Sequence, residues 1–279
     1  FLSALVQEVA DEKKAFQMRQ LATLQLKNAV DAKDEQQRAH LAQRWLMIAD
    51  DVKNKIKLMV VSQASALRCR IGILIVLSAQ AIAKIAAIEL PQKMWGDLVP
   101  TIVKNISTGN PYLRESSFEA LGDLCQSVSC TRAPNQLRPF STPILAAISS
   151  GMKKEETNNA IKLAATQALA NSLDFCKDNM NDAGHRNMIM GMIFTATQCT
   201  DHLVRVAAYQ CFVEIATSYY SFLAQYIDNI LKLTSAALEQ EHPDVQLQAI
   251  EFWSSICDEE IELIQEMKEV SSPSASSPH

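Results

Sequence analysis

Residues 201–217, DHLVRVAAYQCFVEIAT, decide the fold class. Their apolar or small side chains recur at i, i+3, i+4, i+7, i+8 and i+11, which puts them on one stripe of an α-helix: Val204, Ala207, Ala208, Cys211, Phe212 and Ile215. Small residues near the start of the stripe allow a neighbouring helix to approach closely. The stretch therefore predicts a helix that packs along its length against other helices.

The same stripe recurs along the chain, and a polar or basic residue follows each of its starts: Met18-Arg19, Leu113-Arg114, Ile161-Lys162, Val204-Arg205 and Val245-Gln246. The last four starts are 48, 43 and 41 residues apart. A period in the forties with two helices per unit is typical of HEAT and armadillo repeats. We therefore expect an all-α protein, an α-α superhelix of about six helical hairpins in a single solenoid over 1–270, with repeats near 1–30, 36–90, 93–128, 138–175, 183–217 and 219–258.

The composition agrees with helices and excludes several other classes. Hydrophobic residues make up 48% of the 279 residues, whereas there are only 7 Gly and 9 Pro, too few for a protein of many short strands. Polar residues interrupt the most apolar stretch, 71–90, so we expect no membrane insertion. Residues 271–279 are rich in Ser and Pro and are predicted to be a disordered tail. Residues 1–10 show no signal-peptide pattern and begin without Met inside an expected helix, so we expect a fragment.

No catalytic, cofactor or metal motif is visible. The glycines form no phosphate-binding loop and no serine nucleophile turn. The histidines are spread one per region, at positions 40, 185, 202, 242 and 279, and Cys125 and Cys130 are the only close pair of cysteines. A net charge of −5 argues against general binding of nucleic acid. We therefore expect a monomeric binding scaffold with reduced thiols, and no enzyme, cofactor, metal or nucleic-acid partner.

Six short strings resemble one family: 24–28 LQLKN, 43–48 QRWLMI, 151–156 GMKKEE, 162–166 KLAAT, 196–199 ATQC and 251–260 EFWSSICDEE. These strings are similar to the importin beta family of nuclear import receptors. The resemblance runs in order along the chain from Phe1 to about Glu262. The resemblance implies the second to seventh HEAT repeats of a longer superhelix. It also implies a location in the cytoplasm, the nucleus and the nuclear pore.

In this family, second helices of the early repeats hold Ran, a small GTPase, in its GTP-bound form. The resemblance carries that role to two helices of this chain, with the residues Lys27, Asn28, Arg114, Glu115, Glu119 and Asp123. Residues 64–78 depart most from the family pattern, and the sequence does not place the start of a helix there.

The resemblance also implies a groove between first helices for the aromatic rings of Phe-Gly (FG) nucleoporins. Its matching positions are Leu145, Ala146, Ser149, His185, Met188 and Ile189, and a second groove is expected near Phe222, Tyr226 and Ile230. Ser149 and Met188 replace bulkier or aromatic residues of the family pattern, and His185 replaces an acid.

A third implied surface is an acidic second helix that resembles the start of the region binding the adaptor importin alpha: Asp258, Glu259, Glu260 and Glu262. Most of that region lies beyond His279, so we expect weak or absent adaptor binding. The expected function is that of a transport receptor that carries cargo through the nuclear pore and responds to Ran-GTP. The alternative is another HEAT scaffold, such as a phosphatase regulatory subunit, with shorter and more even repeats.

Overall fold

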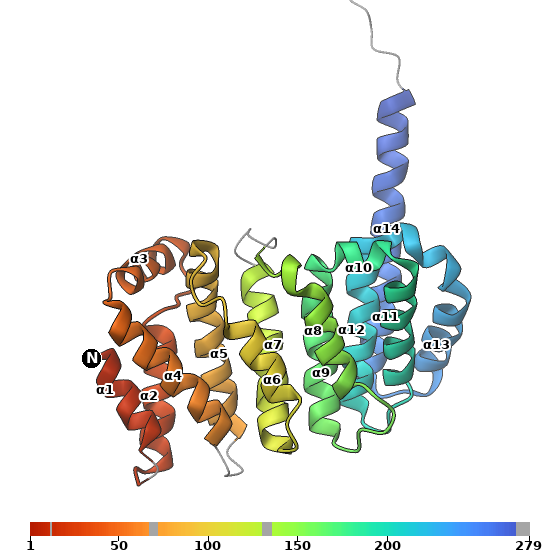
Figure 1. Cartoon of the computed structure of the whole chain (residues 1–279). Helices are drawn as coiled ribbons and strands as arrows, with labels where there is room; N and C mark the ends of the chain where they lie inside the picture. Colours follow the sequence, from red (N-terminus) through yellow and green to blue (C-terminus); the bar gives the residue numbers. More distant parts are fainter. Residues whose placement is uncertain (12, 67–71, 130–135, 272–279) are drawn as a thin grey trace, which may run out of the picture. The chain divides into compact units, whose positions relative to one another are not determined.

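A computed structural model describes residues 1–11, 13–66, 72–129 and 136–271, and within these ranges every regular element is a helix (Figure 1). The chain divides into two compact units, Phe1–Arg186 and Asn187–His279. The predicted tail from residue 272 onward, and residues 67–71 of the stretch 64–78, lie outside the described residues. The all-α prediction is confirmed for the part of the chain that the structure describes.

The first unit contains four antiparallel hairpins: α1 (Leu2–Ala10) with α2 (Phe16–Asn28), α4 (Asp50–Ala66) with α5 (Gly72–Glu89), α6 (Leu98–Ile106) with α7 (Pro111–Ser129), and α8 (Ser141–Gly151) with α9 (Asn159–Ser172). The second helices form one layer, in which α5 packs between α2 and α7, and α7 packs against α9. The first helices form the other layer, with contacts between α1 and α4 and between α6 and α8 (Figure 1).

The second unit contains most of α11 (Ala183–Ala196), followed by α12 (His202–Tyr219), α13 (Ile227–Gln240) and α14 (Pro243–Ser271). Helix α14 packs against both α12 and α13. Phe212 of α12 lies at the centre, with ring centroids 5.6 Å from Phe194 of α11 and 6.2 Å from Phe252 of α14. The second unit therefore continues the helical arrangement, and the bounds of the six expected repeats stay a prediction.

Two of the stripes found in the sequence are buried throughout, whereas Met18, which starts the stripe on α2, is 53% exposed. All six residues of the stripe in 201–217 are buried, as are the equivalent residues of α9 from Ile161 to Ser172. Small residues permit close packing, and Gly151 of α8 is the extreme case. A Cβ atom at Gly151 would lie 2.6 Å from Cζ of Phe118 and 2.7 Å from Cβ of Ala165, so only glycine fits here without rearrangement.

The sequence missed several elements. Helix α3 (Glu35–Leu46) was not predicted, although Asp34 caps it by accepting a hydrogen bond of 2.8 Å from the backbone N–H of Gln37. Among the described residues the short α10 (Lys177–Asn181) was also missed, as were the 3-10 turns η1 (Leu90–Gln92), η3 (Arg138–Phe140), η4 (Leu173–Phe175) and η5 (Tyr220–Gln225).

Helix α14 continues to Ser271, whereas its apolar stripe had indicated an end near 257. The extension consists mainly of Glu, Ile, Leu, Gln, Met and Lys, most of which favour helix, but Ile261, Leu263, Ile264 and Met267 are exposed. None of the described helices combines the length and the apolar character that a membrane span requires. Cys125, Cys176 and Cys211 are buried, as predicted for core thiols.

Candidate binding surfaces

The residue after each stripe start has a structural role in most hairpins. The Nε atom of Arg19 donates to the carbonyl oxygen of Val9 at 3.0 Å, and Nε of Arg114 donates to that of Ile106 at 3.2 Å. The side chains of Arg205 and Gln246 make the same kind of bond, to the carbonyl groups of Cys199 at 2.8 Å and of Leu238 at 3.0 Å. These carbonyls lie at or near the ends of first helices, so the side chain ties the second helix of a hairpin to the first.

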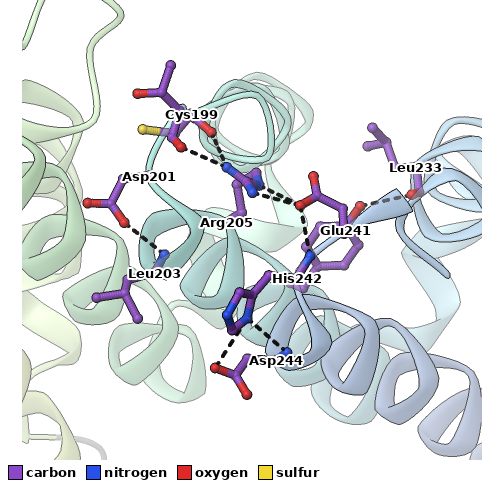
Figure 2. Close-up of polar contacts among 10 residues, drawn as sticks. Cys199, Asp201, Leu203, Arg205, Leu233, Glu241, His242 and Asp244 are labelled. Atoms are coloured by element: carbon purple, nitrogen blue, oxygen red, sulfur yellow. Dashed lines mark hydrogen bonds and ion pairs between the residues drawn. The ribbon is translucent and has the colours of Figure 1, made fainter. Parts of the chain in front are cut away.

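Arg114, a predicted Ran contact, also forms an ion pair of 2.8 Å with Glu156 in the next hairpin. Burial raises the pKa of Glu156, but hydrogen bonds from the backbone of Asn158 and from Arg114 outweigh it and leave that pKa below its usual value. Arg205 makes the equivalent pair with Glu241, at 2.7 Å (Figure 2). The guanidinium of Arg114 is therefore already engaged within the first unit.

Four of the predicted Ran residues, Lys27 on α2 and Glu115, Glu119 and Asp123 on α7, lie on one polar face of the second-helix layer, which we call the inner face. The Nζ atom of Lys27 donates to Oε1 of Gln80 on α5 at 3.2 Å. Burial raises the pKa of Asp123 to about 6, and the nearby positive charges of Lys84 and Lys27 partly oppose that rise. Asn28 does not share this face, because it lines a separate cavity with Trp45.

Three acids follow one another at i, i+4 and i+8 on α7, namely Glu115, Glu119 and Asp123. Burial raises the pKa of Glu119 to about 7, and the charges of Glu115 and Asp123 add to the rise. Burial also raises the pKa of Glu115. Oε2 of Glu119 is buried and accepts no hydrogen bond from the described residues.

Glu119 and Asp123 line a cavity of about 150 Å³ between α7 and α9, together with Phe118, Gly122, Ala164, Gln167 and Asn171. An uncompensated carboxylate at such a place favours a positively charged group from outside the chain. The inner face therefore offers a binding site for basic side chains. The sequence named these acids only through the family resemblance, and their i, i+4 and i+8 spacing on one helix was a signal that it did not use.

The residues of the predicted FG groove belong to both units. On α8 in the first unit, Leu145 is buried, Ala146 is exposed and Ser149 is partly exposed. His185 lies at the end of the same unit, with its Nδ1 3.1 Å from Oδ1 of Asp182. In the second unit, Ile189 is buried, whereas Met188 is exposed.

The second predicted groove lies entirely in the second unit. Ile230 is fully buried in α13 and is a core residue. The hydroxyl group of Tyr226 donates to Oδ1 of Asn187 at 2.5 Å, and its ring centroid is 6.5 Å from that of Phe194. Phe222 and Tyr226 are partly exposed, so they are the two residues of this set that a partner can reach.

A groove of the expected type, between two first helices, occurs where the sequence did not predict it. A cavity of about 430 Å³ lies between α4 and α6 and is lined by residues that include Lys57, Leu58, Trp95 and Thr101. Leu58 is 72% exposed, and Nζ of Lys57 lies 5.2 Å from the ring centroid of Trp95. Trp95 adopts a φ of 59°, which a sequence pattern does not reveal.

The predicted adaptor residues lie on the exposed half of α14. Asp258, Glu260 and Glu262 are exposed and Glu259 is partly exposed, and the carboxylate of Glu260 accepts a hydrogen bond from the hydroxyl group of Tyr220.

One pair of histidines was missed in the sequence analysis. His202 and His242, which the sequence assigned to separate regions, have ring centroids 4.3 Å apart in the second unit.

Two family models match the chain. The model described as "IPO5-like, TPR repeats" covers residues 77–233, and the model "Importin-beta N-terminal domain" covers residues 1–63. Importin subunit beta-1 of Arabidopsis thaliana is 38% identical over 266 residues, which are 95% of this chain and 30% of the relative. The chain thus spans about a third of the length of the curated relatives it matches.

Two solved structures extend the match to three dimensions. The Kap95:Nup1 complex has a TM-score of 0.83 at 36% identity, over 99% of this chain and 32% of the other. A structure whose title states that Kap95p binding induces the switch loops of RanGDP to adopt the GTP-bound conformation has a TM-score of 0.85 at 35% identity, over 99% and 32%. The predicted fold class, an α-α superhelix, is confirmed by these matches.

Proposed function

Because this chain belongs to the importin-beta family, we propose that it serves a nuclear transport receptor as a binding scaffold for Ran-GTP and FG nucleoporins. In that role it helps to carry cargo through the nuclear pore and is found in the cytoplasm, the nucleus and the pore. The proposal assigns no catalytic step to the chain. The alternative of a phosphatase regulatory subunit has no comparable support, because both family models are importin-type by description.

The observation that carries the Ran proposal is the acidic cavity of the inner face. Glu119 has a buried oxygen that no described group satisfies, and Asp123 lies beside it in the same cavity. A lysine or arginine of a partner that enters this cavity replaces the missing hydrogen bond and neutralises a charge. Kap95, of which 32% matches nearly the whole of this chain, is described as acting on the switch loops of RanGDP. We therefore place Ran on the inner face, with Glu119, Asp123 and Lys27 as its principal contacts.

Substitution at the inner face tests this assignment. Asp123→Asn should weaken binding of GTP-loaded Ran by roughly 10-fold or more, since a hydrogen bond to a charged group contributes about 1.5–3 kcal/mol. Glu251→Gln is the matched control, because it removes one acid from an exposed position on α14. Equal weakening by the two variants would indicate a loss of general electrostatic attraction and would contradict binding of Ran at the inner face.

We propose that FG nucleoporins bind to the exposed apolar residues of the first helices and of the turns beside them. Met188 is 37% exposed on α11, and Phe222 and Tyr226 reach the surface near α13. A methionine accepts an aromatic ring through dispersion and sulfur–aromatic contact. The groove at Leu58 between α4 and α6 is a further site of the same type. The Kap95:Nup1 complex supports this choice of partner, because it is a nucleoporin complex of a similar chain.

Retention on immobilised Phe-Gly peptides tests these positions. Met188→Asp and Leu58→Asp should each reduce retention, because each places a charge where an aromatic ring would dock. Leu247→Asp is the control, since Leu247 is a similarly exposed apolar residue of a second helix. Unchanged retention of both groove variants would rule out these positions as ring-binding sites.

A further inference from the structure

Three potential metal ligands meet in the second unit, where the turn between α11 and α12 lies beside the turn before α14. His202 is the first residue of α12, and His242 and Asp244 flank Pro243 at the start of α14. One ligand atom from each of the three residues lies within 4.8 Å of the other two. His202 is partly buried and the other two are exposed, so an ion from solution can reach all three.

The spacing of these atoms suits a zinc ion. Two ligands that are each about 2.1 Å from zinc, at a tetrahedral angle, are about 3.4 Å apart. Nδ1 of His242 is 3.5 Å from Oδ2 of Asp244, which already matches this separation. The ring centroids of His202 and His242 are 4.3 Å apart at an interplanar angle of 30°, so these side chains would have to rotate for a nitrogen of each to face one ion.

The residue types of the cluster also fit. Nδ1 of His242 accepts a hydrogen bond of 3.3 Å from the backbone N–H of Asp244, so an ion bound at this nitrogen would displace that bond. Two imidazoles and one carboxylate favour zinc and similar transition metals over magnesium or calcium, which prefer oxygen ligands alone.

The two turns that carry the ligands are held together without any ion (Figure 2). Arg205 donates to Oε2 of Glu241 from Nε at 3.1 Å and from Nη2 at 2.7 Å. Its Nη1 donates to the carbonyl groups of Cys199 at 2.8 Å and Thr200 at 3.0 Å. Figure 2 shows Arg205 between Cys199 and Glu241, with His242 following directly after Glu241. Arg205 therefore joins the backbone before α12 to the side chain of Glu241 before α14, which lowers the entropy cost of assembling the ligands.

We propose that His202, His242 and Asp244 form a zinc site, with water at the remaining coordination position. The bound ion links the start of α12 to the start of α14 and so restricts rotation of the fifth hairpin against the sixth. This site is separate from the proposed Ran and FG surfaces, and none of its residues is assigned to either.

Zinc titration of the whole chain against a chromogenic chelator tests the site. The wild-type protein should take up one equivalent that competes with the chelator. His202→Gln and His242→Gln should each weaken this uptake by 10-fold or more, and Asp244→Asn should weaken it to a smaller extent. His185→Gln is the matched control, because His185 is a partly exposed histidine beside an aspartate, outside the cluster. Uptake that persists in His202→Gln, or that shows no defined stoichiometry, would overturn the proposal.

Two further measurements separate this site from binding at thiols and from loss of the fold. Cobalt-loaded protein should lack a thiolate-to-metal charge-transfer band, whereas a strong band would assign the ion to cysteine and refute the site. Zinc should raise the midpoint of thermal unfolding for the wild type and not for His242→Gln, and the two proteins should unfold at similar temperatures without zinc. An equal rise in both would contradict the assignment of the ion to His242.

Discussion

Replacing Glu119 with Gln should stabilise the protein at alkaline pH and leave its stability at acidic pH nearly unchanged. Burial raises the pKa of Glu119 from 4.5 to about 7, with further contributions from the charges of Glu115 and Asp123. The native state therefore binds this proton more tightly than the unfolded state does. By linkage, the free energy of unfolding falls as the pH rises from about 4.5, the pKa in the unfolded state, to about 7, and is lowest above that range.

The size of the effect follows from the shift. A change of one pKa unit corresponds to about 1.4 kcal/mol, so a rise from 4.5 to about 7 costs the wild type roughly 3 kcal/mol at pH 8. Gln has nearly the same shape as Glu and carries no charge, so the variant should be more stable than the wild type by up to that amount at pH 8. At pH 4 the carboxyl group is already neutral in both states, and the two proteins should differ little.

Urea unfolding monitored by circular dichroism, at intervals between pH 4 and pH 8, measures this difference. Glu251→Gln serves as the control, because Glu251 is exposed on α14 and its loss should leave the pH profile unchanged. A Glu119→Gln variant that is less stable than the wild type at pH 8, or that keeps the wild-type pH profile, would refute the assignment of an uncompensated charge to Glu119.

Four more outcomes are expected. A partner cation beside Glu119 favours the ionised form of its carboxyl group, so GTP-loaded Ran should bind more weakly at pH 6 than at pH 8. Glu119→Gln should flatten this pH dependence. A wild-type affinity that rises at pH 6 would exclude such a contact. Glu89→Gln should destabilise the protein by about 3–5 kcal/mol in urea unfolding, because it leaves the buried ammonium group of Lys57, 2.8 Å away, without its counter-charge. Gly151→Ala should lower the free energy of unfolding by about 1–3 kcal/mol, because the new methyl group overpacks the core. Gly191→Ala, in a helix with nothing within 4 Å of the new methyl group, should instead raise it by about 0.5–1 kcal/mol. Equal shifts of the thermal midpoint would contradict the packing at α8. Arg205→Lys should lower the thermal midpoint, since lysine cannot donate to Glu241 and to two carbonyl groups in the same geometry, and it should also weaken any zinc uptake.

The sequence predicted the hairpins because helical periodicity and burial are the same signal here. Phe212 and its stripe had to face a neighbouring helix, and the structure buries them. The pattern also identified the polar residue after each stripe start but not its purpose. The bond from Arg205 to Cys199 and the pair with Glu241 depend on how successive hairpins stack. Spacing within one helix carries no information about that stacking.

The same limit explains what was missed in the binding surfaces. His202 and His242 are forty residues apart, and their rings meet only because equivalent turns of successive hairpins lie side by side. The cavity at Glu119 depends on residues of α9 as well as α7. Helix α3 has no apolar stripe of the type used in the prediction. In the structure Trp45 is accordingly its only fully buried side chain. Contacts of this kind require the fold, whereas the family resemblance required only the short strings of sequence.

Binding of the whole chain to Ran loaded with GTP, compared with Ran loaded with GDP, tests the proposed role of the inner face most directly. Isothermal titration should give clearly tighter binding to the GTP form, and Asp123→Asn should remove most of that preference. Equal affinity for the two nucleotide forms, or a preference that Asp123→Asn leaves intact, would contradict it.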